Sequence, residues 1–181
     1  MGKIEIKFIF CGLKQEFLYK LKSHLEETFF LEVNISSLST DLSQAYDVKR
    51  NQYLAEVIIN QVKDFKKNIN EKWLLIVDID LYAKGLNFIF GEADPRRGIS
   101  IISLVRLRPE FYRQKPNEKL FFERILKEAT HELGHLFYLP HCENSKCVMY
   151  FSNSILDTDR KDKYFCDHCK SLLKANIILK I

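Results

Sequence analysis

The sequence predicts an α/β fold in which a mixed, mostly parallel twisted sheet is packed with helices, one of them long. Two observations predict it. Segments with the two-residue period of strands alternate with segments of helical period, in the order β-α-β-α-β-β-β. The last two strands are separated only by the turn sequence Asp94-Pro95-Arg96-Arg97-Gly98, which indicates an antiparallel pair within the otherwise parallel sheet.

Each element follows from its apolar pattern. The first strand alternates Ile4, Ile6, Phe8 and Phe10, and Gly12 breaks it. We expect strands at residues 3–10, 31–35, 73–81, 87–92 and 99–105, and helices at residues 13–29, 53–65 and 166–178. With 181 residues the chain suits a single domain, 1–181, with an N-terminal part of about 1–139 and a C-terminal part of about 140–181.

Composition excludes several classes of protein. Hydrophobic residues make up 46% of the chain and charged residues 29%, which excludes a disordered or low-complexity protein. The net charge of +4 comes without a basic cluster, so we expect no nucleic-acid partner. The N-terminus lacks the apolar stretch of a signal peptide, and no apolar run approaches the ~20 residues of a membrane span. We therefore expect a cytoplasmic protein without a membrane partner, and we assume a monomer.

A long helix begins at Pro116-Asn117-Glu118, where Asn117 is the expected N-cap. An apolar stripe at helical spacing should pack on the sheet, and it consists of Phe122, Leu126, Ala129, Leu133 and Phe137. The opposite face is polar, and it carries Arg124, Lys127, Glu128, His131 and His135.

Residues 131–135 of this helix, His-Glu-Leu-Gly-His, form an H-E-x-x-H motif. Residues four apart lie one above the other on a helix, so His131 and His135 can reach one metal ion. Glu132 lies about 100° around the helix, where it can hold a metal-bound water without being a ligand. Zinc lowers the pKa of such a water to around 7, and a carboxylate can take its proton as general base.

His141 can complete this site only if the helix ends before it. On an uninterrupted helix His141 would lie roughly 15 Å beyond His131 along the axis. Pro140 disfavours helical geometry at Leu139, so the chain can turn back. Three neutral imidazoles with an open fourth position make a catalytic zinc site, for which amide hydrolysis is the expected reaction. The alternative is a solvated, polar helix face with incidental histidines.

Four of the five cysteines lie close to the C-terminal end: Cys142, Cys147, Cys166 and Cys169. The gaps of four and two residues suit a tetrahedral Cys₄ zinc site. The segment between the pairs lacks the apolar residues of a core of its own, and a metal would supply that stability. The alternatives are two disulfides or a redox pair, which a cytoplasmic location disfavours. Cys11 ends an apolar strand and is expected to be a buried small hydrophobe.

Together these motifs resemble the archaemetzincins (archaelysins), a family in the metzincin clan of zinc metallopeptidases. The matching stretches are residues 131–142, 147–149 and 166–169, and residues 88–93 and 102–107 are similar to the family's strands before the helix. The resemblance implies a metzincin-like fold with a zinc-stabilised C-terminal segment. It also implies hydrolysis of peptides or small proteins, which is aminopeptidase-like in some members.

The resemblance further implies roles for the residues of the motifs. His131, His135 and His141 would bind the catalytic zinc, with Glu132 as the general base. Met149 would form the Met-turn, an apolar floor beneath the three imidazoles. The four C-terminal cysteines would bind a second, structural zinc, which makes two Zn²⁺ per chain.

A strand before the motif bears on substrate binding, and a residue just after it bears on the turn. The strand with Gly91, Glu92 and Ala93 would be the sheet edge along which an extended peptide pairs. Tyr138 stands where metzincins carry the Gly of H-E-x-x-H-x-x-G-x-x-H. We expect Pro140 to end the helix along an unstrained path, so that His141 still binds metal although the turn has a different shape.

Three functions compete at this point. The leading hypothesis is a zinc metallopeptidase, which the intact Glu132 favours. The rival is a zinc-stabilised peptide-binding protein with little or no catalysis, which Tyr138 favours. A zinc-ribbon module that binds nucleic acid is the third, and the lack of a basic cluster near the cysteines argues against it.

Overall fold

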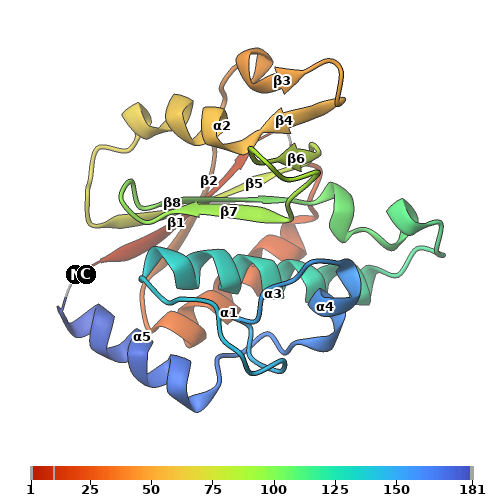
Figure 1. Ribbon diagram of the computed structural model, residues 1–181. Coiled ribbons are helices and arrows are strands. Elements are labelled where there is room, and N and C mark those ends of the chain that lie inside the picture. Colours follow the sequence, from red (N-terminus) through yellow and green to blue (C-terminus); the bar gives the residue numbers. More distant parts are fainter. Residues whose placement is uncertain (1, 10, 180–181) are drawn as a thin grey trace.

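A five-stranded sheet with strand order β2-β1-β5-β8-β7 forms the centre of the protein (Figure 1). The computed structural model describes residues 2–9 and 11–179. The five strands are β1 (Lys3–Ile9), β2 (Val33–Ser37), β5 (Glu71–Val77), β7 (Gly91–Asp94) and β8 (Ile99–Ser103). Four of them run parallel, whereas β7 is antiparallel to β8 and lies at the edge. The predicted mixed, mostly parallel sheet is therefore confirmed.

Five α-helices and a small second sheet complete the fold. The helices are α1 (Gln15–Phe29), α2 (Ala55–Val62), α3 (Glu118–Leu136), α4 (Ile155–Arg160) and α5 (Asp167–Leu179). The second sheet is formed by β3 (Tyr46–Asp47), β4 (Gln52–Leu54) and β6 (Leu81–Tyr82). Single 3₁₀ turns lie at Ser43–Ala45, Lys63–Phe65, Val105–Leu107 and Pro109–Tyr112. Within the described part of the chain, no helix is both long and apolar enough to cross a membrane.

The helices cover the two faces of the large sheet. Helix α2 lies over one face, and α1 and α3 lie over the other, with α4 and α5 beyond them (Figure 1). The central strand β5 is buried from both sides because Leu74 and Ile76 face the core with α1 and α3, whereas Leu75 and Val77 face the core with α2. This two-sided burial explains why β5 reads as a continuous apolar run.

Several predicted boundaries differ from the structure. The strand expected at 73–81 ends at Val77, because Asp78 and Asp80 turn aside to form bidentate ion pairs with Arg108 and Arg106 (2.6–2.7 Å). The strand expected at 87–92 begins only at Gly91. The strands of the small sheet are too short to show a period, and so is the six-residue helix α4. Phe10, predicted to end β1, lies outside the described residues.

Helix α3 begins as predicted but is covered on both faces. The Asn117 side chain accepts a hydrogen bond from the Leu120 N–H at 3.0 Å, as expected of an N-cap. The apolar stripe packs in the core that α3 shares with the sheet. The polar face is buried as well, because the Arg124 guanidinium binds Asp159 of α4 through two 2.7 Å contacts and is only 1% exposed. The C-terminal segment thus packs over the face that a solvated-helix interpretation would expose.

Candidate active site

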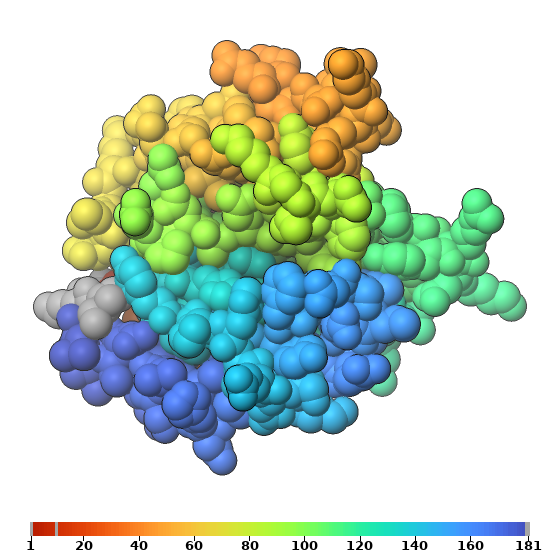
Figure 2. All heavy atoms as spheres, viewed as in Figure 1, coloured from red at the N-terminus to blue at the C-terminus, as the bar shows by residue number. Residues whose placement is uncertain are grey.

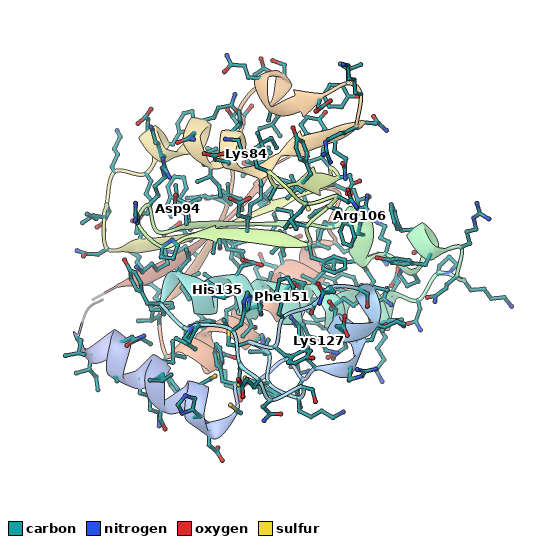
Figure 3. All side chains as sticks on the ribbon, viewed as in Figure 1. Lys84, Asp94, Arg106, Lys127, His135 and Phe151 are labelled. Carbon is teal, nitrogen blue, oxygen red and sulfur yellow. The ribbon has the colours of Figure 1, made fainter. Side chains whose placement is uncertain are left out.

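Three imidazoles converge at the C-terminal end of α3. His131 and His135 lie one turn apart on the helix, and His141 follows the turn after it (Figure 3 labels His135). The Nε2 atom of His135 is 3.1 Å from Nε2 of His131 and 3.2 Å from Nε2 of His141. Ligands at 2.0–2.1 Å around a tetrahedral zinc ion lie about 3.3–3.4 Å apart. Both separations from His135 are therefore close to the ligand spacing of a zinc coordination tetrahedron, and all three nitrogens lie within 4.8 Å of one another.

Hydrogen bonds on the Nδ1 atoms fix the tautomers of His131 and His135. His131 Nδ1 donates to the Val148 carbonyl and His135 Nδ1 donates to the Leu139 carbonyl, both at 2.8 Å. Burial lowers the pKa of His131 well below its usual value, the pKa of His135 to about 4, and the pKa of His141 as well. The Nε2 atoms of His131 and His135 then both carry lone pairs, and these two atoms lie 3.1 Å apart. That arrangement is repulsive unless a cation lies between them.

The turn after α3 contradicts the unstrained path that we expected. The helix ends at Leu136, and Tyr138 has a left-handed backbone with φ 60°. The Leu139 N–H donates to the Gly134 carbonyl (3.1 Å) and the Tyr138 N–H to the His135 carbonyl (2.9 Å), which is a Schellman motif. This motif needs a left-handed residue, so Tyr138 adopts the conformation of the glycine it replaces. It also brings the Leu139 carbonyl to His135 Nδ1.

Glu132 lies against the edge strand β7. Its side chain is buried, and burial, together with the nearby Glu128, raises its pKa well above the usual value. A Cβ atom on Gly91 would lie 2.7 Å from Glu132 Cγ and Oε1 and 2.8 Å from the Ile101 carbonyl oxygen. Only glycine fits there. Gly91, predicted to lie on a substrate-binding edge, also makes room for the Glu132 carboxylate.

Met149 packs against α3 at Gly134. Met149 is fully buried, and a Cβ on Gly134 would lie 2.5 Å from its Sδ atom. Gly134 is the residue just before His135, so the thioether contacts the helix beside the convergent histidines. The role of Gly134 was not predicted from the sequence. A glycine within an otherwise regular helix was the available signal.

The thiols of Cys142, Cys147, Cys166 and Cys169 form a second cluster of possible metal ligands. Their Sγ atoms lie within 4.8 Å of one another, and Cys142 and Cys166 are 3.8 Å apart. Thiolates at 2.3 Å around a tetrahedral zinc lie about 3.8 Å apart. All four are free cysteines, and burial raises the pKa of Cys147 and Cys169. The cluster therefore has the geometry of a metal site, and the half-buried Cys11 does not belong to it.

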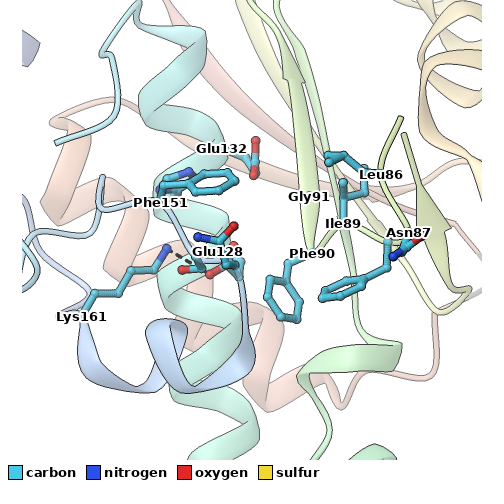
Figure 4. Close-up of a pocket in the computed structure, with 13 residues that line it drawn as sticks. Leu86, Asn87, Ile89, Phe90, Gly91, Glu128, Glu132, Phe151 and Lys161 are labelled. Carbon is cyan, nitrogen blue, oxygen red and sulfur yellow. Dashed lines mark ion pairs between the residues drawn. The ribbon is translucent and has the colours of Figure 1, made fainter. Parts of the chain in front are cut away.

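A cavity of about 210 Å³ opens beside His131 and Glu132 (Figure 4). Three parts of the chain enclose it besides α3: residues 86–91 before and at the start of β7, residues 151–153 after Met149, and Lys161 at the end of α4. In the space-filling view, the surface around β7 lies directly above that of the segment after α3 (Figure 2). Sequence reasoning missed Phe151 and Lys161, because neither belongs to a motif or a periodic pattern.

Comparison with known proteins agrees with this geometry. The sequence pattern of peptidase family M54 matches residues 2–175. The chain belongs to this family. The archaemetzincin of Pyrococcus abyssi is 51% identical over 134 residues, which cover 74% of this chain and 71% of the relative. The archaemetzincin of Thermococcus kodakarensis is 38% identical over 173 residues, with 92% and 93% covered.

Solved structures extend the likeness to the fold. The crystal structure of an archaemetzincin from Methanopyrus kandleri has a TM-score of 0.84 at 34% identity and covers 98% of this chain and 96% of its own. A zinc-dependent peptidase from Methanocorpusculum labreanum has a TM-score of 0.86 at 30% identity, with 93% and 99% covered. The predicted resemblance to the archaemetzincins is confirmed, and with it the predicted class, a zinc metallopeptidase.

The close approach of Gly91 to Glu132 leads to a first prediction. Gly91→Ala should lower the free energy of unfolding by about 1–3 kcal/mol, because the new methyl group must displace Glu132 or the β8 backbone. Denaturant unfolding measures this. The control is Gly12→Ala, where a Cβ meets nothing within 4 Å. Equal stability of the two variants would contradict the steric argument.

The left-handed turn leads to a second prediction, made as a paired comparison. Tyr138→Gly and Tyr138→Ala both remove the ring, but only glycine relieves the backbone. We expect the Gly variant to be more stable than the Ala variant by about 1 kcal/mol in thermal or denaturant unfolding. A more stable Ala variant would show that the turn relaxes out of the left-handed region.

Proposed function

We propose that this chain hydrolyses peptide bonds with a zinc ion held by His131, His135 and His141 and with Glu132 as general base. The observation that carries the proposal is the pair of Nε2 lone pairs held face to face at 3.1 Å beside a buried carboxylate. Family membership supports it, as does the zinc-dependent peptidase among the similar structures. The donor set of three neutral imidazoles fits zinc.

The protein residues have separate tasks in this proposal. Zinc, when bound, lowers the pKa of a water ligand and polarises the scissile carbonyl. The Glu132 carboxylate makes no hydrogen bond to another described residue, so its oxygens are free to accept a proton from the attacking water. The same group then donates that proton to the leaving nitrogen.

The edge strand provides the place for an extended substrate. β7 pairs with β8 on one side and is the edge strand of the large sheet, so its other side pairs with no strand of that sheet. The backbone of Gly91, Glu92 and Ala93 can hydrogen-bond a peptide there as an added strand. The substrate class is therefore a peptide or a small protein in extended form. Comparing each peptide with its N-acetylated form tests whether cleavage is aminopeptidase-like.

The four cysteines hold a second, structural zinc in this proposal. Sγ atoms at tetrahedral spacing fit the ion, and four thiolates would leave no open position for a substrate. Reduced thiols agree with the predicted cytoplasmic location. All four cysteines lie after residue 139, so this zinc would tie the turn after α3, with Cys142 and Cys147, to the start of α5, with Cys166 and Cys169.

A third prediction separates a peptidase from a zinc-stabilised binding protein. Glu132→Gln should retain two zinc ions per chain, because Glu132 is not a ligand, and should hydrolyse peptides at least about 100-fold more slowly. Elemental analysis and a peptide-library assay measure the two quantities. His135→Ala is the control and should lose one zinc equivalent. Equal cleavage by the parent and Glu132→Gln, or only one zinc in the parent, would contradict the proposal.

A fourth prediction concerns coupling between the two metal sites. Cys166→Ser should weaken zinc binding at the histidines by about 10–100-fold, although Cys166 contacts no histidine. The reason is that Cys147 of the same cluster immediately precedes Val148, whose carbonyl orients His131. Titration against a chromophoric chelator measures the affinity, with Cys11→Ser as the control outside the cluster. Unchanged affinity in Cys166→Ser would show that the sites are independent.

A further inference from the structure

The cysteine cluster, formed by Cys142, Cys147, Cys166 and Cys169, lies beside a cavity. Cys142 and Cys166 are half-buried, whereas Cys147 and Cys169 are buried. The cavity, of about 280 Å³, lies between the turn after α3 and the start of α5, and its lining includes Cys142 and Cys169. A water molecule occupies roughly 30 Å³ in the liquid, and hydrogen peroxide is only slightly larger. We therefore expect small oxidants to reach the cluster.

Two members of the cluster are placed to form a disulfide. The Sγ atoms of Cys142 and Cys166 are 3.8 Å apart, although the two residues are separated by 24 positions in the chain. The sulfur atoms of a disulfide are about 2.05 Å apart, so bond formation draws these two atoms together by roughly 1.8 Å. The bond would join the segment directly after His141 to the segment directly before α5. Such a change moves the backbone at one end or at both.

The backbone at Cys142 leads to one histidine of the site. Cys142 follows His141 directly, and its N–H donates to the Met149 carbonyl at 3.0 Å. The Nε2 atom of His141 lies 3.2 Å from that of His135. A shift of Cys142 toward Cys166 therefore displaces His141 relative to His135 and strains the turn that carries Met149.

The backbone near Cys166 leads to a second histidine. Two residues before Cys166, the Tyr164 carbonyl accepts a hydrogen bond from the Val148 N–H at 3.0 Å. The carbonyl of the same Val148 accepts the Nδ1–H of His131 at 2.8 Å. A shift of Cys166 is thus passed through Tyr164 and Val148 to the hydrogen bond that orients His131. Each of the two cysteines is linked to a different histidine of the site.

We propose that Cys142 and Cys166 form a redox-sensitive switch that controls the metal site of the histidines. In the reduced state the cluster holds zinc and supports the positions of His131 and His141. A peroxide converts the two cysteines to a disulfide, the cluster loses its zinc, and metal binding by the histidines weakens. A dithiol reductant reverses the change. The inference rests on the two zinc sites of the proposed function and adds a regulation of that function.

The oxidation proceeds in two steps. The Cys142 thiolate attacks hydrogen peroxide, so that an S–O bond forms, the O–O bond breaks, and hydroxide leaves. The Cys166 thiolate then attacks this sulfenic sulfur, so that the S–S bond forms, the S–O bond breaks, and a second hydroxide leaves. The two sulfur atoms together lose two electrons, the peroxide gains them, and two solvent protons convert the hydroxides to water. The zinc ion is not oxidised, but it keeps only two of its four thiolate ligands.

The test uses the zinc-loaded protein with Cys11→Ser, which removes the thiol outside the cluster, and one equivalent of hydrogen peroxide. A chromophoric chelator should take up one zinc per chain, two thiols per chain should disappear, and mass-spectrometric mapping should find Cys142 bonded to Cys166. Zinc affinity at the histidines should fall by about 10–100-fold and return after dithiothreitol and zinc are added. His135→Ala in the same background is the matched control. It holds only the cluster zinc and should release one equivalent as well.

Zinc release and disulfide mapping need no hydrolysis, so the switch and the peptidase can fail separately. Retention of both zinc ions after peroxide, a disulfide between other cysteines, no release from His135→Ala, or unchanged affinity at the histidines would overturn the switch. All of the expected changes in a protein that cleaves no peptide in either state would keep the switch and refute hydrolysis. Equal cleavage before and after complete oxidation would keep the peptidase and refute the switch.

Discussion

Two backbone carbonyls, those of Leu139 and Val148, hold the site together. Each accepts the Nδ1–H of one imidazole of α3, and this leaves the Nε2 lone pairs of His135 and His131 directed at one point. Neither carbonyl belongs to α3. A helix can place two histidines on one face, but the direction of each ring depends on where the chain after the helix presents its oxygens. The turn and the C-terminal segment are therefore part of the proposed metal site.

The C-terminal segment reaches that position through contacts that are mostly polar. Arg124 and Glu128 of α3 bind Asp159 and Lys161, and these ion pairs hold α4 against the helix. Such buried pairs add little net stability but strongly penalise any other arrangement, because separating them leaves an uncompensated charge. The sulfur cluster fixes the other end of the segment. Ion pairs and the cysteine cluster therefore define the path of the segment. Val148, Met149 and Ile155 are buried in the core between these two sets of contacts.

Local patterns predicted the parts of the structure that depend on local physics. The periodicity of β1, α1 and α3 and the cap at Asn117 act within a few residues, so they were visible in the sequence. The sequence spacing of the histidines and of the cysteines is typical of metal ligands, and the structure brings the members of each set close to one another. The small sheet, α4, and the pairing of Lys161 with Glu128 depend on residues far apart in the chain, which no local pattern records. Tyr138 was misjudged because its left-handed backbone is imposed by the Schellman turn against its own preference.

The tyrosine in that turn connects the helix end to the sheet edge. A left-handed tyrosine costs about 1–2 kcal/mol relative to glycine, whereas burying a residue such as Leu139 recovers about 1.5–3 kcal/mol. Leu139 is only 2% exposed, so its burial offsets the strain. The Tyr138 hydroxyl also donates to the Pro95 carbonyl at 3.4 Å, in the turn between β7 and β8. Glycine could make the same turn but not this link. The side chain thereby links the end of the histidine helix to the hairpin that carries the edge strand, so the turn contacts both the histidines and the strand proposed to align the peptide.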